Sequence, residues 1–303
     1  NTITKRPAAK PAYSLTTQFG AFNLRRQTID FTGPIDAGKR VLYRLVAAHE
    51  QADSFRDHVN NDRWTLLPAV TYVFRPDTRA TVSHEYLHSR QTMDAGLPIF
   101  TGDTAVRLPR ERFLSLPEFD YEIIKRATRA FLDHRFSDRW SMRIGYVYTT
   151  IWLDKPGGQL TGQASASTRR QPRRINTQHI EADSHVFQAD VLGQFKTGFI
   201  SHRTLLGVDW RNRDNRLSTV AQNITPNFVD VDAPTYVYAL SGAPSTLNRN
   251  TARSVSSGAF IQNQASLWQE KLQLVVGFRL DATEQESTSL TLPQPVNYRA
   301  PNV

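Results

Sequence analysis

The segment Trp140–Trp152, "WSMRIGYVYTTIW", alternates between two kinds of side chain. One set is large and apolar: Trp140, Met142, Ile144, Tyr146 and Tyr148. The other set is mostly small or polar: Ser141, Arg143, Gly145, Val147 and Thr149. Successive side chains of an extended strand point to opposite faces, so a period of two predicts a β-strand with one apolar face.

The same period recurs along the chain and predicts about eleven strands. They cover residues 13–22, 25–32, 40–50, 63–74, 79–90, 121–136, 140–152, 179–195, 202–212, 254–268 and 271–281. Many of them have ten residues or more, whereas an ordinary strand has about five to six. A tilted strand needs about 9–11 residues to cross a bilayer. Their length therefore favours a membrane-spanning sheet.

The connections between these strands alternate in length. Tight links lie at 33–39, 75–79, 136–140, 196–202 and 268–271. Long polar links lie at 51–62, 91–120, 153–177, 213–253 and from 282 onward, and one short link at 22–25 breaks the pattern. Short turns at one end and long loops at the other are typical of outer-membrane barrels. A soluble β-sandwich would also alternate, but such long structureless loops count against a compact soluble domain.

Composition limits the chemistry. The chain has no cysteine, which excludes disulfides, thiolate zinc sites and cysteine catalysis. A formal charge of +9 leaves nucleic acid, anionic lipid or an acidic ligand as partners. The chain contains no run of about 18 apolar residues, so no transmembrane helix is predicted. Aromatic residues near strand ends would suit a membrane-interface girdle: Tyr13, Phe74, Trp140, Trp152 and Trp268.

Four stretches resemble one known family. "NTITKRPAAKPAYSLTTQFGAFNLRRQTIDFTGPI" (1–35) resembles the junction between plug and barrel in TonB-dependent outer-membrane ferric-siderophore receptors. "VLYRLVAAHEQADSFRD" (41–57) resembles the next strand and its outer loop. "RWTLLPAVTYVFRPDTRATVSHEYLHSRQTMDAGLPIF" (63–100) resembles a following hairpin and loop. "GAFIQNQASLWQEKLQLVVGFRLDA" (258–282) resembles a later hairpin, with Asn263 where an Asp is common. The matches occur in order along the chain.

The resemblance implies an all-β fold, a transmembrane antiparallel β-barrel of the 22-stranded type with an N-terminal plug. Eleven strands are about half of that number, so we expect an incomplete barrel. Residues 1–9 would end the plug, and residues 10–303 would form the N-terminal half of the barrel with long extracellular loops. The implied location is the outer membrane of a Gram-negative bacterium.

The family also implies partners. These are a ferric siderophore, the TonB energy-transducing system, outer-membrane lipid and lipopolysaccharide, and nucleic acid is not among them. Iron would arrive already chelated, so we expect no cofactor, no protein metal ligand and no catalytic residue. A passive porin-like channel is an alternative function, because it would share the barrel but lack a plug and energy coupling.

Aromatic residues in the long links are the candidate ligand-binding residues. Family pockets are commonly aromatic, and aromatic rings pack well against a hydroxamate or catecholate complex. The candidates are Phe100, Phe113, Phe228, Tyr236 and Tyr238. The alternative is that these residues pack the loops together or lie at the membrane interface.

The letters His84-Glu85-Tyr86-Leu87-His88 match H-E-x-x-H, a zinc-hydrolase signature. Two histidines four residues apart can share one zinc on a helix, but on a strand they lie about 13 Å apart. The β-branched and aromatic flanks predict a strand here. We therefore expect His84, Tyr86 and His88 to share one face, with Glu85 on the other, and zinc-dependent hydrolysis is kept as an alternative function.

The basic run "TRRQPRR" (168–174) is interpreted as a solvated loop. Nucleic-acid binding is an alternative, although no aromatic platform accompanies the arginines. In an outer membrane this loop would also be positioned to meet the phosphates of lipopolysaccharide.

Overall fold

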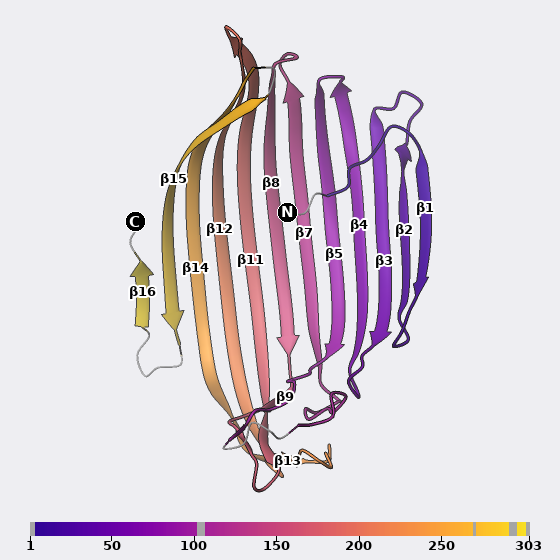
Figure 1. Cartoon of the computed structure of the whole chain (residues 1–303), viewed down its shortest axis with the longest axis vertical. Helices are drawn as coiled ribbons and strands as arrows, with labels where there is room; N and C mark the ends of the chain where they lie inside the picture. The colour runs from indigo at the N-terminus through magenta and orange to yellow at the C-terminus, as the bar shows by residue number, and fades with distance from the viewer. Residues whose placement is uncertain (1–3, 102–106, 269–270, 291–295, 301–303) are drawn as a thin grey trace.

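The computed structural model describes residues 4–101, 107–268, 271–290 and 296–300. Twelve strands lie side by side in one antiparallel sheet, in chain order (Figure 1). They are β1 (Ala12–Phe19), β2 (Arg25–Pro34), β3 (Val41–Asp53), β4 (Asn60–Arg75), β5 (Thr78–Thr92), β7 (Asp120–Arg135), β8 (Trp140–Lys155), β11 (Arg170–Thr197), β12 (Ile200–Thr225), β14 (Ala239–Leu267), β15 (Leu272–Ser289) and β16 (Val296–Ala300). Short strands at the loop end are β6 (Phe100–Thr101), β9 (Gly158–Leu160), β10 (Ala164–Ser165) and β13 (Phe228–Asp230).

All eleven predicted strands are present, and β16 is an additional one. The sheet is open: within the described residues, β1 and β16 are its two edges and do not pair with each other. Among these residues there is also no helix long and apolar enough to cross a membrane. The all-β, incomplete-barrel prediction is confirmed.

The register assigns every side chain to one of two faces, because directly opposed residues in an antiparallel pair share a face. Ile144 of β8 opposes Leu132 of β7 and Ala189 of β11. The outer face of the sheet carries a band of apolar side chains that are well exposed in this chain. They include Leu66, Val70, Tyr72, Val82, Tyr146, Phe187, Leu206, Val208, Ile261 and Phe278. Side chains exposed in this way are what lipid covers in a barrel wall.

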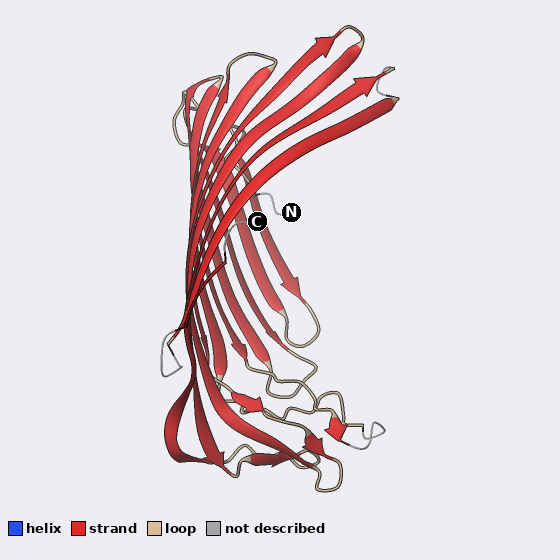
Figure 2. Ribbon diagram, turned by 90° about the vertical axis from the view of Figure 1, so that its left-hand side faces the viewer, coloured by secondary structure: helices blue, strands red, loops and turns tan. Residues whose placement is uncertain are grey.

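The inner, concave face is polar and carries the N-terminal segment, residues 4–11, which runs across it (Figure 2). Lys5 Nζ lies 2.7 Å from Asp30 of β2, and Arg6 Nη1 lies 3.2 Å from Asp133 of β7. Arg44 of β3 donates to Asp30 and to the carbonyl oxygen of Arg6. Two neighbouring residues of this segment therefore contact strands on opposite sides of β3, β4 and β5.

The two ends of the sheet differ as predicted: tight turns lie at the top of Figure 1, and the longer connections lie at the bottom. Much of what we predicted as long links is nevertheless strand. β11, β12 and β14 have 28, 26 and 29 residues, and they include most of 170–177 and 213–253. β15 likewise continues to Ser289. The periodicity misses these extensions because both faces are polar beyond the membrane, although the backbone ladder continues.

Candidate functional site

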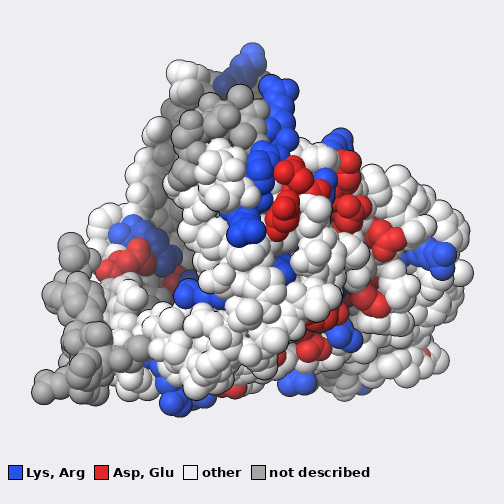
Figure 3. Space-filling view, turned by 90° about the horizontal axis from the view of Figure 1, so that it is seen from below, with Lys and Arg blue, Asp and Glu red and all other residues white. Residues whose placement is uncertain are grey.

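The connections at the loop end fold together into one structure, which we call the loop cap. It consists of the described residues of 54–59, 93–119, 156–169 and 226–238, with the adjoining start of β11. In Figure 2 these connections turn toward the concave side of the sheet. Seen from this end, Lys and Arg side chains lie beside Asp and Glu side chains rather than in separate fields (Figure 3).

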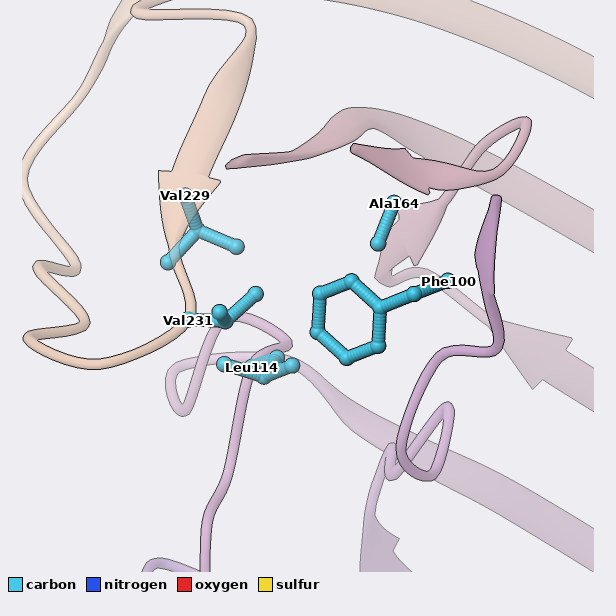
Figure 4. Packing of buried hydrophobic residues seen from close by; sticks show 5 residues of the cluster. All are labelled: Phe100, Leu114, Ala164, Val229 and Val231. Carbon is cyan, nitrogen blue, oxygen red and sulfur yellow. The ribbon is translucent and has the colours of Figure 1, made fainter. Parts of the chain in front are cut away.

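The loop cap has its own hydrophobic core, because residues from three connections bury apolar side chains against one another. Phe100 and Leu114 come from the connection 93–119, Ala164 from 156–169, and Val229 and Val231 from 226–238 (Figure 4). A second cluster joins Leu116 to Ile175 of β11 and Ile224 of β12, with Phe119 and Tyr238 packed against it. Connections that share a core hold one another in place, so the cap is a packed structure rather than a set of independent loops.

Polar contacts tie the same connections together. Arg56 Nε lies 2.7 Å from a carboxylate oxygen of Asp94. Arg169 binds Asp232 through two nitrogens, and Arg112 donates to the backbone carbonyl of Asp232. The Arg169 guanidinium keeps the pKa of Asp232 below its usual value. Each contact crosses from one connection to another.

The five candidate aromatics are all in or beside this cap. Phe113 is 1% exposed and Phe100 is 6% exposed, so both are part of the cap's interior. Phe228, Tyr236 and Tyr238 are half-buried. Their role in ligand contact stays a prediction, and a ligand could reach Phe100 and Phe113 only if the connections part.

The two tyrosines are held by specific partners. Tyr236 donates its hydroxyl to the backbone carbonyl of Phe113, and its ring lies edge-on to His58 at 4.9 Å. Burial raises the pKa of Tyr236. Burial, and then a hydrogen bond to Glu118, raises the pKa of Tyr238. Both hydroxyls therefore stay protonated well above neutral pH, as hydrogen-bonding groups require. No sequence pattern points to His58, because its partners Phe113 and Tyr236 lie far away in the chain.

The basic run 168–174 is not a solvated loop, and that interpretation is wrong. Its arginines pack into the loop cap: Arg169 lies over Phe100, and Arg170 lies 4.1 Å from the ring centre of Phe228. Arg173 is 1% exposed and donates to the carbonyl of Thr235. Polar composition suggested solvent, but the connection 226–238 covers the start of β11.

The burial of the Arg173 side chain is energetically unfavourable. Its Nε and Nη1 are buried without a hydrogen-bond partner among the described residues. Burial lowers the pKa of Arg173, although the nearby Glu118 opposes this effect. A buried cation with two unsatisfied donors is destabilising by itself, so other contacts of the cap must offset it.

The H-E-x-x-H motif lies on β5, as the strand prediction required. His84 contacts the Thr128 hydroxyl at 3.0 Å, and His88 contacts Glu122 at 2.5 Å, both on the outer face. Glu85 is on the inner face, where it binds Lys125 and Arg129. The described residues contain no group of three His, Cys, Asp or Glu side chains placed to hold a metal ion. The geometry of one zinc between His84 and His88 is not available on a strand.

Comparison with known proteins identifies this architecture. The family model described as "TonB dependent receptor-like, beta-barrel" matches residues 63–302. The chain belongs to the TonB-dependent receptor β-barrel family. Proteins of this family lie in the outer membrane of Gram-negative bacteria, and the apolar band on the outer face places this TonB-dependent receptor chain there as well.

Two curated relatives illustrate the relationship. The metal-pseudopaline receptor CntO of Pseudomonas aeruginosa is 27% identical over 298 residues, which cover 96% of this chain and 41% of that protein. The ferrioxamine B receptor of Salmonella typhimurium is 26% identical over 286 residues, with coverages of 90% and 39%. The chain thus spans about two fifths of the length of these receptors.

A solved structure shows the same fold. The siderophore receptor PiuA from Acinetobacter baumannii superposes with a TM-score of 0.83 at 18% identity. The superposition covers 98% of this chain and 46% of PiuA. The open sheet described above therefore corresponds to a part of the wall of a larger TonB-dependent receptor barrel.

Proposed function

We propose that the intact protein is an outer-membrane receptor for TonB-dependent uptake of ferric siderophores. The observation that carries this proposal is the family membership of the barrel wall, together with relatives whose names describe metal–siderophore receptors. The chelate would bind through the extracellular loops and the plug, and it would be carried with its iron already chelated. The barrel would then need no catalytic residue and no resident cofactor.

We further propose the domain division expected from the sequence, with residues 1–9 ending the plug and 10–303 forming barrel wall. Two features support it. Lys5 and Arg6 are anchored to carboxylates of the concave wall, and the backbone nitrogen of Ala8 donates to the Thr32 hydroxyl at 2.9 Å. The segment thus enters the sheet from the lumen, where a plug would lie.

The loop cap is the proposed outer mouth of the receptor. Phe228, Tyr236 and Tyr238, which are half-buried, would contact the chelate directly. Phe100 and Phe113 would do so only in an opened cap, and in the closed cap they hold the connections together. Outer-membrane lipid would cover the apolar band, and lipopolysaccharide phosphates would meet exposed cations such as Arg170.

Uptake of radioactive iron tests the function. A strain that lacks its own receptor and expresses the intact protein should accumulate iron from a ferric siderophore only when TonB is present. Equal accumulation without TonB would instead indicate a passive porin-like channel. No accumulation from any hydroxamate, catecholate or carboxylate chelate would refute the receptor function.

A further inference from the structure

Two tryptophans of the outer face lie where the apolar band ends toward the loop end, and each of them contacts a histidine. Trp64 of β4 is 52% exposed and stacks on His49 of β3, with ring centres 3.8 Å apart. Trp152 of β8 lies edge-on to His179 of β11 at 5.5 Å. Tryptophans at the end of an apolar strand face are typical of the boundary between hydrocarbon and lipid head groups. The two histidines therefore lie at the level of the head groups.

Both histidines also contact a carboxylate, and a third pair of the same kind lies between them. His88 of β5 belongs to this third pair and directly opposes Trp64 in the register. Between Nε2 and a carboxylate oxygen, the pairs are His49–Asp62 at 3.1 Å, His88–Glu122 at 2.5 Å and His179–Glu181 at 3.2 Å. We call these three pairs the histidine collar.

The collar is accessible from the outside of the barrel wall. Its six side chains are between 24% and 45% exposed. It lies on the outer face of strands inside the sheet, between β3 and β11. A plug in the lumen, or further strands beyond the edges β1 and β16, would not cover it. The molecules that meet the collar are therefore the lipids around the barrel.

The groups that face the collar come from each neighbouring strand. Gln27 of β2 opposes His49, and Asp154 of β8 opposes His179. Arg90 of β5 opposes Asp62 and binds Asp120. Arg216 of β12 contacts Glu181 at 3.4 Å. Two further histidines on this face contact hydroxyl groups: His84 with Thr128, and His185 with Tyr146.

Carboxylates outnumber arginines in this part of the outer face. In the described strands from β4 to β11, beyond the apolar band, the carboxylates are Asp62, Asp120, Glu122, Asp154, Glu181 and Asp183, and the arginines are Arg90 and Arg126. With neutral histidines this surface is therefore negatively charged, and it repels lipid phosphate groups.

Protonation of the histidines reverses this effect. Histidine is the side chain whose ordinary pKa, about 6.5, lies between pH 5 and 8, whereas carboxylates stay ionised throughout that range. In mildly acidic medium each protonated ring neutralises the carboxylate that it contacts. The remaining cations, Arg90 and Arg126 among them, can then attract a phosphate group.

We propose that the histidine collar is a proton-sensitive contact for the phosphate groups of lipid A in the outer leaflet, which it binds tightly in mildly acidic medium and weakly above neutral pH. The collar lies beside the boundary tryptophans, so a bound phosphate group belongs to a lipid whose acyl chains cover the apolar band. This contact is independent of the ligand that the receptor carries.

Energy transfer to labelled lipid A tests the collar locally. A donor fluorophore is attached to Leu66→Cys of the intact receptor, because Leu66 lies two residues from Trp64 on the same face. The receptor is placed in phosphatidylcholine vesicles that contain a small fraction of lipid A with an acceptor on an acyl chain. The transfer efficiency then gives the preference for lipid A over phosphatidylcholine at this place.

The triple variant His49→Gln/His88→Gln/His179→Gln is compared with wild type at each pH, which cancels the titration of lipid A's own phosphates. We expect equal preferences at pH 8, and a preference for lipid A about tenfold stronger in wild type at pH 5.5. Equal preferences at both pH values would overturn the proposal. A difference that persists with lipid A stripped of its phosphates would overturn phosphate as the partner.

His134→Gln is the matched control. His134 lies on the outer face at the turn end of β7, where it contacts the Thr78 hydroxyl at 2.8 Å. This position is on the opposite side of the apolar band from the collar. The variant should therefore bind lipid A as wild type does at both pH values, and a loss equal to that of the triple variant would contradict a site at the collar.

Removal of the carboxylates tests the same contact from the other side. Asp62→Asn/Glu122→Gln/Glu181→Gln should prefer lipid A about tenfold more strongly than wild type at pH 8, because the repelling charges are gone. An unchanged preference at pH 8 would overturn the role of the pairs. Folding of every variant is checked by its mobility in unheated gels. No siderophore enters these measurements, so their result does not depend on whether the intact protein carries one.

Discussion

Leu206 lies in the middle of the apolar band on the outer face of β12. It opposes Val191 of β11 and Ile261 of β14, and it is 39% exposed in this chain. His202 and Trp210 flank the band, four residues away on either side. Eight residues of tilted strand rise by about 20 Å, which puts Leu206 close to the bilayer midplane.

We predict that Leu206→Arg destabilises the folded receptor by about 2–4 kcal/mol, the cost of an arginine at the midplane of a barrel's lipid face. A change of this size alters the folding equilibrium constant by roughly thirtyfold to a thousandfold. The assay is urea titration of the intact receptor in phosphatidylcholine vesicles. Folded and unfolded protein are separated by their mobility in unheated gels.

Asn212→Arg is the control, because Asn212 lies on the same face of the same strand but beyond the apolar band, on the side of the loop end. There an arginine should cost only about 0–1 kcal/mol. If the two variants were destabilised equally, the outer face would not be in contact with lipid at Leu206, and the placement of the membrane would be refuted.

Three further predictions address the anchor, the cap and the zinc motif. An Ala8→Cys/Thr32→Cys disulfide should form, because the present hydrogen bond brings these residues within reach. It should leave siderophore uptake unchanged if the plug's end stays fixed during transport, whereas uptake restored only by a reductant would contradict this. Arg173→Met should stabilise the cap by about 1–2 kcal/mol, since it removes two unsatisfied buried donors; faster hydrogen exchange of residues 226–238 would argue against this. His84→Ala and His88→Ala should not change the metal content of purified protein, and zinc lost in either variant would revive the hydrolase alternative.

The membrane-crossing strands could be predicted from sequence because lipid imposes a local rule. A strand between lipid and a polar lumen must alternate, and segments such as Trp140–Trp152 show that alternation directly. The alternation is no longer required where a strand leaves the hydrocarbon region of the membrane. β12 continues to Thr225 and β14 begins at Ala239, and their pairing there depends on neighbours rather than on an apolar face.

The loop cap was predicted less well because its contacts join residues that are distant in the chain. The sequence places Phe113 and Tyr236 in long links as aromatic residues, but it does not show that they contact each other. Arg173 looked solvent-exposed because its neighbours are polar, and it is buried only because the connection 226–238 lies over it. His84 and His88 show the opposite case, in which strand geometry alone corrected a misleading motif.

Spin labels placed one at a time at residues 202–216 of β12 in the vesicle-embedded receptor test the central claim most directly. The account predicts that even-numbered positions up to Trp210 collide with dissolved oxygen in the lipid, whereas odd-numbered positions do not. From Asn212 toward the loop end, labels on the outer face should become accessible to a water-soluble nickel reagent. Uniform accessibility along the strand, or alternation that continues unchanged past Asp214, would contradict a barrel wall that crosses the membrane at this level.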